Sequence, residues 1–99
     1  MIKWEDRSNA MERCWWLLTI RDVCDVSVSR PTVAEAWRVA IGWSAGRRDR
    51  FALPAHWDDE QAKAEALRFL APQLAALAVN LGSALQQVAD AIDAAAAAR

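Results

Sequence analysis

Ser27-Val28-Ser29-Arg30-Pro31-Thr32-Val33, continued by Ala34-Glu35-Ala36-Trp37-Arg38, is the stretch with the strongest local structural signals. Ser29 is a favourable helix N-cap, and Pro31 falls in the following turn, where its missing N–H costs nothing. Val28 and Val33 stand five residues apart and can anchor the segment in an apolar core. The pattern predicts a tight turn followed by a helix that starts after Ser29 and runs to about Ala45.

Two further helices are predicted before this stretch. Asn9 followed by Glu12 has the spacing of a capping pair, and apolar residues at helical spacing extend it into a helix over 10–18. Thr19 and Asp22 have the same spacing and predict a short helix over 20–25. The N-terminal half is therefore expected to hold three helices.

The composition also favours helices. The 99 residues are enough for one domain, and they include 22 alanines but only three glycines, three prolines and no tyrosine. The alternation of Val23, Val26 and Val28 could instead form a short strand, but no second strand is obvious, so we favour the helix. We predict an all-α fold, with a tryptophan-rich helical unit and an arginine-rich connector over 1–57 and a long helical segment over 58–99.

The predicted C-terminal helix has a clear beginning. Asp58 is its expected N-cap, and Asp59 and Glu60 fall in the first turn, where the helix dipole favours negative charge. Pro72 lies opposite the main apolar series and predicts a kink or a break in the helix. The segment is thus expected to be one long helix or a kinked pair.

This helix carries a heptad pattern. Two interleaved apolar series are spaced by sevens: Leu67, Leu74, Leu81, Val88 and Ala95, and Leu70, Leu77, Ala84, Ala91 and Ala98. Such a 3-4 repeat is typical of helices that associate with one another. We therefore predict self-association through an oligomer interface made of Leu67, Leu70, Leu74, Leu77, Leu81, Leu85, Val88 and Ile92.

A membrane span is the alternative for the uncharged residues 69–89, which are long enough to cross a bilayer. Glutamines, an asparagine, a proline and many alanines argue against it, and the apolar residues form one stripe. The N-terminus lacks the apolar core of a signal peptide, and Cys14 and Cys24 are best read as two thiols in a reducing compartment. We expect a cytoplasmic protein without a membrane partner.

Catalytic and metal-binding signals are weak. His56 stands near Asp58, Asp59 and Glu60, but the acidic residues are better explained as a helix start. The chain has no glycine-rich phosphate loop and no recognisable nucleophile motif. We predict no metal, no cofactor and no enzymatic activity.

Residues 19–38 resemble the helix-turn-helix of bacterial and phage DNA-binding proteins. The match is best over the Val28–Val33 segment, whereas Ser27 stands where the family usually has glycine. The resemblance implies that the third helix enters the major groove of double-stranded DNA, with Arg30 or Arg38 reading guanine. It implies a DNA-binding set made of Ser29, Arg30, Thr32, Glu35, Arg38, Arg47, Arg48 and Arg50.

The charge distribution is compatible with two functions. The net charge of −1 excludes a strongly basic coat, but residues 26–50 carry five arginines against two acidic residues. The first hypothesis is an oligomeric DNA-binding accessory or regulatory protein, of phage or cellular origin. The alternative is a small protein-interaction module, such as a phage-encoded inhibitor or an assembly component. It would bind its partner through exposed tryptophans, all six of which precede residue 58, or through the alanine-rich C-terminal helix.

Overall fold

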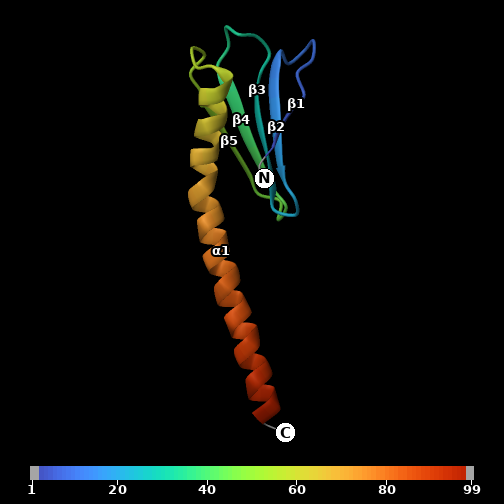
Figure 1. The fold of residues 1–99 in the computed structure, drawn as a ribbon, viewed down its shortest axis with the longest axis vertical. Coiled ribbons are helices and arrows are strands. Elements are labelled where there is room, and N and C mark those ends of the chain that lie inside the picture. Colours follow the sequence, from blue (N-terminus) through green and yellow to red (C-terminus); the bar gives the residue numbers. More distant parts are fainter. Residues whose placement is uncertain (1–2, 98–99) are drawn as a thin grey trace. The chain divides into compact units, whose positions relative to one another are not determined.

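The computed structural model describes residues 3–97, which form an antiparallel sheet followed by one long helix (Figure 1). Each strand pairs with the next strand in the sequence, so the order across the five-stranded sheet is β1-β2-β3-β4-β5. The elements are β1 (Trp4–Asp6), β2 (Cys14–Ile20), β3 (Cys24–Arg30), β4 (Trp37–Trp43), β5 (Arg48–Leu53) and α1 (Asp59–Ala97).

The chain divides into two compact units, Met1–Leu67 and Arg68–Arg99. The first unit holds the sheet and the opening turns of α1, and the second holds the remainder of α1. Ala98, the last member of the predicted heptad series, lies outside the described residues.

The core of the first unit lies on one face of the sheet, which we call the inner face. Every second side chain is buried along β3 and along β4 as far as Ile41, as expected for strands with one covered face. The register places Val26 opposite Ile41 and Val28 opposite Val39, so the two central strands share one apolar layer. The buried hydrophobic side chains contributed by the sheet are Leu18, Cys24, Val26, Val28, Trp37, Val39, Ile41 and Leu53.

The opening turns of α1 cover this inner face. Ala62 and Ala66 are completely buried, and their small side chains allow the helix backbone to approach the sheet closely. The indole Nε1 of Trp16 donates a hydrogen bond to Asp59 Oδ2 at 2.9 Å. The Lys63 ammonium lies 4.0 Å from the centre of the Trp16 ring, which is a cation–π contact. Two successive turns of the helix are thereby fixed to β2.

The all-α prediction is wrong, because 32% of the described residues are in strands and residues 3–57 form no helical unit. The predicted helices over 10–18, 20–25 and 30–45 are replaced by β2, β3, β4 and their connections. The connector expected before residue 58 contains β5. Consequently, the residues expected to form a helix-turn-helix are strands and a loop in the described chain.

Local signals misled these predictions. Asn9 Oδ1 accepts hydrogen bonds from the backbone N–H groups of Met11 and Glu12, both at 2.9 Å, but this forms a turn between β1 and β2. Pro31 follows the last residue of β3 and begins the β3–β4 loop. Asn, Ser, Asp and Pro are favoured in turns for the same physical reasons that they are favoured at helix starts.

The prediction of a long C-terminal helix is confirmed. The Asp58 side chain accepts a hydrogen bond from the Gln61 N–H at 2.8 Å, and the Gln61 side chain accepts one from the Asp58 N–H at 2.9 Å. This reciprocal pair caps the start of α1. The helix is continuous through Pro72, so the predicted break does not occur. By length and composition alone, α1 could also cross a membrane.

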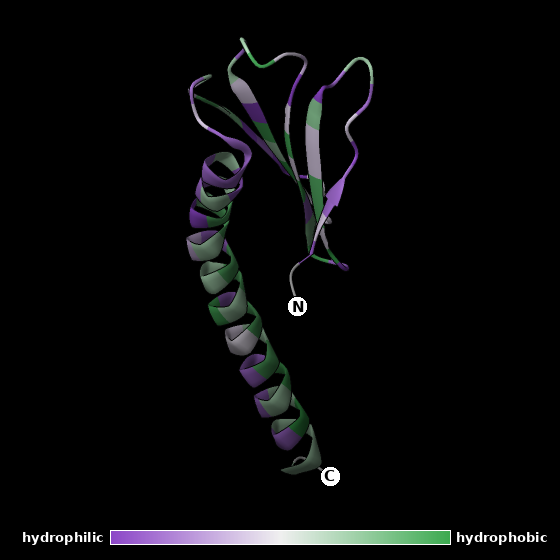
Figure 2. Cartoon of the chain, turned by 45° about the horizontal axis from the view of Figure 1, so that its top comes forward, coloured by the Kyte–Doolittle hydropathy of each residue, from purple (hydrophilic) through white to green (hydrophobic). Residues whose placement is uncertain are grey.

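Hydropathy is unevenly distributed around the C-terminal part of α1. In Figure 2 its hydrophilic residues gather on one side of the ribbon and its hydrophobic residues on another. Large aliphatic side chains in this part, including Leu81, Leu85, Val88 and Ile92, are exposed.

Candidate ligand-binding face

The face of the sheet opposite the inner face, which we call the open face, has a regular composition. Strand register aligns its side chains in three rows that run from β2 to β5. The rows are Thr19, Asp25, Gly42 and Arg48; Leu17, Ser27, Ala40 and Arg50; and Trp15, Ser29, Arg38 and Ala52. Along β3 and β4, four of these six residues are serine, alanine or glycine.

The small side chains of β3 and β4 form the floor of a trough on this face. Large side chains stand along β2, and arginines stand along β5, roughly 14 Å away across three strand spacings. Three hollows of about 260, 240 and 410 Å³ follow one another along the trough. The first two share Asp25, Gly42 and Arg48, and the last two share Ala40 and Arg50. The hollows therefore form one continuous surface.

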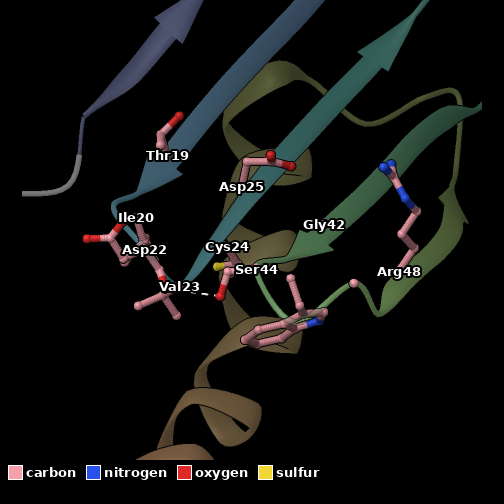
Figure 3. A pocket seen from close by; sticks show the side chains of 11 residues that line it. Thr19, Ile20, Asp22, Val23, Cys24, Asp25, Gly42, Ser44 and Arg48 are labelled. Atoms are coloured by element: carbon pink, nitrogen blue, oxygen red, sulfur yellow. Dashed lines mark hydrogen bonds between the residues drawn. The ribbon is translucent and has the colours of Figure 1, made fainter.

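Gly42 leaves room for the Asp25 carboxylate in the first hollow. A Cβ atom at this position would lie 2.9 Å from Asp25 Oδ1, so a larger residue would require the Asp25 side chain to move. Figure 3 shows the Asp25 carboxylate above Gly42, and Arg48 rises from the neighbouring strand β5. The carboxylate and the guanidinium therefore border the same hollow, and both are exposed.

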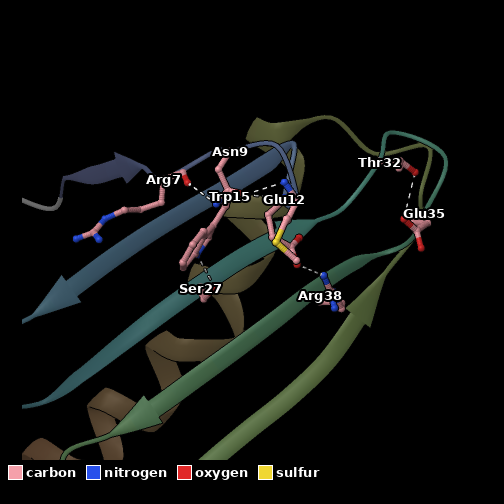
Figure 4. A network of polar contacts seen from close by, with 9 residues as sticks. Arg7, Asn9, Glu12, Trp15, Ser27, Thr32, Glu35 and Arg38 are labelled. Atoms are coloured by element: carbon pink, nitrogen blue, oxygen red, sulfur yellow. Dashed lines mark hydrogen bonds and ion pairs between the residues drawn. The ribbon is translucent and has the colours of Figure 1, made fainter.

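Two polar contacts order the other end of the trough (Figure 4). The indole Nε1 of Trp15 donates to Ser27 Oγ at 3.0 Å, which fixes the half-buried ring toward β3. Arg38 forms a hydrogen-bonded ion pair with Glu12. The positive charge of Arg38 is therefore neutralised by the loop between β1 and β2.

The two arginines of β5 on the open face differ from Arg38. Within residues 3–97, the side chains of Arg48 and Arg50 make no hydrogen bond or ion pair, and both are exposed. By contrast, Arg47 donates to Asp49 Oδ2 at 2.8 Å, and its guanidinium lies 5.4 Å from the Trp43 ring centre. The free positive charge of the trough thus belongs to Arg48 and Arg50.

Asp49 is held in its charged form by its neighbours. Hydrogen bonds from the Arg47 guanidinium and from the Trp43 indole, the latter at 3.0 Å, lower the pKa of this carboxyl below its usual value. Its negative charge is taken up by Arg47 and Trp43 at the β4–β5 hairpin. Asp49 is on the inner side of the register and does not neutralise Arg48 or Arg50 by an ion pair.

The residues predicted to bind DNA are dispersed. Ser29, Arg38, Arg48 and Arg50 lie together on the open face. Arg30 lies on the inner face and is only 6% exposed, so it is a core residue. The remaining three lie in connections outside the trough: Thr32, Glu35 and Arg47. Thr32 Oγ1 donates to Glu35 Oε2 at 3.2 Å within the β3–β4 loop.

The predicted interface residues of α1 fall into three exposure classes. Leu70 is buried, and three others are half-buried, Leu67, Leu74 and Leu77. The exposed members are Leu81, Leu85, Val88 and Ile92. The C-terminal half of the predicted interface is therefore open in the isolated chain.

Of the twelve residues in the three rows, the predicted site contains only Ser29, Arg38, Arg48 and Arg50; it misses the small floor residues Ser27, Ala40 and Gly42, among others. Their signal is the period of two, because small or polar residues alternate with the buried ones in β3 and β4. The described residues contain no group of three His, Cys, Asp or Glu side chains suited to hold a metal. Comparison with known protein families, characterised proteins and solved structures finds no match to this chain.

Proposed function

We propose that the chain binds single-stranded nucleic acid along the trough of the open face. The observation that carries this proposal is the unpaired, exposed state of Arg48 and Arg50 beside a floor of small side chains. Guanidinium groups bind phosphate oxygens with two parallel hydrogen bonds, and a low floor lets a polymer backbone approach the sheet.

An aromatic side chain opposite the arginines adds a stacking surface. Trp15 is half-buried, and its hydrogen bond to Ser27 keeps the indole on the open face. Proteins that bind single strands combine a positive groove with aromatic rings on which bases stack. The hydroxyl groups of Ser27 and Ser29 add hydrogen-bonding capacity to the floor.

The width of the sheet favours a single strand over a duplex. Five strands span about 19 Å, whereas the major groove is about 12 Å wide and admits a helix or a two-stranded ribbon. A sheet face of this width instead suits unstacked bases laid across it. We therefore propose that the sheet contacts the nucleic-acid backbone, in place of a recognition helix that reads bases in the major groove.

Fluorescence anisotropy with labelled single-stranded 20-mers tests the proposal. At low salt we expect binding by the unmodified chain and at least a tenfold weaker affinity for Arg48→Ala/Arg50→Ala. The matched control is Lys3→Ala/Arg21→Ala, which removes the same charge from exposed residues outside the hollows. Equal loss of affinity in both variants would refute a specific trough, because it would reflect net charge alone.

The edge of β5 favours a second candidate, a protein-interaction module. Within residues 3–97, β5 pairs only with β4, so its outer backbone groups are open to an added strand. Failure of every oligonucleotide to bind at low salt would leave this candidate as the better one. A proline at the outward-facing N–H positions of β5 would then be expected to abolish binding to a protein partner.

A further inference from the structure

The C-terminal helix carries an apolar stripe that is separate from the residues of the trough. At about 100° per residue, the aliphatic residues from 67 to 92, apart from alanines and Val79, fall within an arc of about 80°. Its C-terminal members are strongly exposed: Leu81 62%, Leu85 71%, Val88 57% and Ile92 64%. An exposed stripe of this length indicates that another molecule covers it.

Polar residues occupy the other side of the same helix. Seven of them fall in an arc of about 160° opposite the stripe: Gln73, Asn80, Ser83, Gln86, Gln87, Asp90 and Asp93. In a bilayer, a single spanning helix would expose this arc to lipid, where amides and carboxylates are costly. The helix is long and apolar enough to span a membrane, but the one-sided distribution favours an aqueous helical partner.

We infer that the stripe of α1 is covered by the same stripe of further copies of this chain. The charge pattern supports identical partners, because residues 69–89 contain no charged side chain. Asp90 lies about 180° and Asp93 about 120° from the centre of the stripe, so identical helices can meet without like charges facing each other.

The area of the stripe favours more than two copies. Leu81, Leu85, Val88 and Ile92 are spaced by four and three residues, which gives two aliphatic positions per heptad and a narrow seam. Residues 71–97 span about 40 Å, and a helix is about 10 Å wide, so one neighbour covers a footprint of about 400 Å². Two neighbours per helix approach the roughly 800 Å² per partner of a stable interface.

Sedimentation equilibrium of the full chain at about 50 µM tests this inference independently of nucleic acid. We expect a mass of three or more copies, and we expect Leu81→Asp/Leu85→Asp to sediment as a monomer. Val79→Asp is the matched control, because Val79 is 70% exposed but lies outside the stripe. The control should assemble like the unmodified chain. Tryptophan fluorescence should be unchanged in both, since all six tryptophans precede residue 58.

Two results would overturn the inference. A monomeric unmodified chain at this concentration would show that the stripe has no partner of its own kind. Sedimentation of the chain with phosphatidylcholine vesicles, lost equally in Val79→Asp and in the stripe variant, would show that lipid surrounds the helix on all sides.

Discussion

The guanidinium of Arg30 lies 4.0 Å from the centre of the Trp37 indole ring, and both side chains are buried on the inner face. Arg30 also donates hydrogen bonds to the carbonyl oxygens of Ala55 at 2.8 Å and Val33 at 3.3 Å. The end of β3, the start of β4 and the segment before α1 are joined by this one residue. The arginine expected to read DNA is therefore a structural residue.

We predict that Arg30→Ala destabilises the sheet unit by about 2–4 kcal/mol. The substitution removes a cation–π contact made by a buried guanidinium and two hydrogen bonds to backbone carbonyl oxygens. Urea unfolding followed by tryptophan fluorescence measures the change. Arg30→Lys should recover only part of the stability, because an ammonium lacks the planar fork of the guanidinium. A change below 0.5 kcal/mol, roughly that of an ordinary surface substitution, would contradict this role.

The contact between Trp16 and Asp59 predicts a smaller effect. Trp16→Phe removes the indole donor of the 2.9 Å hydrogen bond and weakens the cation–π contact with Lys63. We expect a loss of about 1–3 kcal/mol, since hydrogen bonds to charged groups contribute that much. Urea unfolding followed by circular dichroism is the measurement. Asp59→Asn should cost less, because a neutral carboxamide oxygen still accepts the bond.

Salt dependence provides a second measure of the proposed trough. Each phosphate neutralised on a single strand contributes about −0.7 to the slope of log K against log salt. If Arg48 and Arg50 each contact one phosphate, the slope for Arg48→Ala/Arg50→Ala should be less steep by about 1.4. Affinities at four salt concentrations between 50 and 300 mM, roughly the range in which such slopes are resolved, give this value. An unchanged slope would mean that Arg48 and Arg50 do not contact the phosphate backbone of the nucleic acid.

The two cysteines should differ in reactivity. Burial raises the pKa of the Cys24 thiol, and the nearby Asp25 charge raises it further. Only the thiolate reacts with iodoacetamide, so in the native state Cys14, which is half-buried, should be labelled before Cys24. Peptide mass spectrometry after timed alkylation identifies the order. In denaturant the difference between the two should disappear.

The raised pKa of the Cys24 thiol also predicts that the stability of the fold decreases at alkaline pH. A pKa raised in the folded state means that the folded chain holds its proton more tightly than the unfolded chain. The contribution of the protonated Cys24 thiol to the stability of the fold is complete below the pKa that this thiol has in the unfolded chain. It is lost as the pH rises through the pKa that the thiol has in the folded chain. Cys24→Ala should remove this alkaline loss in thermal melts, although its cavity lowers the melting temperature at every pH.

For Asp49 we predict the opposite pH dependence of stability, at acidic pH. Its pKa is lowered by Arg47 and Trp43, so its contribution is present above the unfolded pKa and is lost as the pH falls through the folded pKa. Asp49→Asn should therefore flatten the decrease in melting temperature in acid. An acid decrease in melting temperature as steep for Asp49→Asn as for the unmodified chain would contradict this prediction.

The sequence by itself determined the helix from residue 59 to 97, because capping, alanine content and heptad spacing act over a few neighbouring residues. It also contained the alternation of β3, where Val26 and Val28 point to the core. A strand is stable only when it is paired, so this alternation does not by itself establish a sheet. The capping pairs at Asn9 and Thr19 were equally compatible with turns.

Only the tertiary structure decided the sheet and the trough. Pairing of β3 with β2 and β4 aligns Trp15 with Ser29 and Arg38, residues as many as 23 positions apart. Pairing with β5 then adds Arg50 to the same face and leaves Arg30 on the other. Arg30 and Arg50 look alike in the sequence. Their roles differ because a side chain's face in a sheet depends on long-range register and on which face the helix covers.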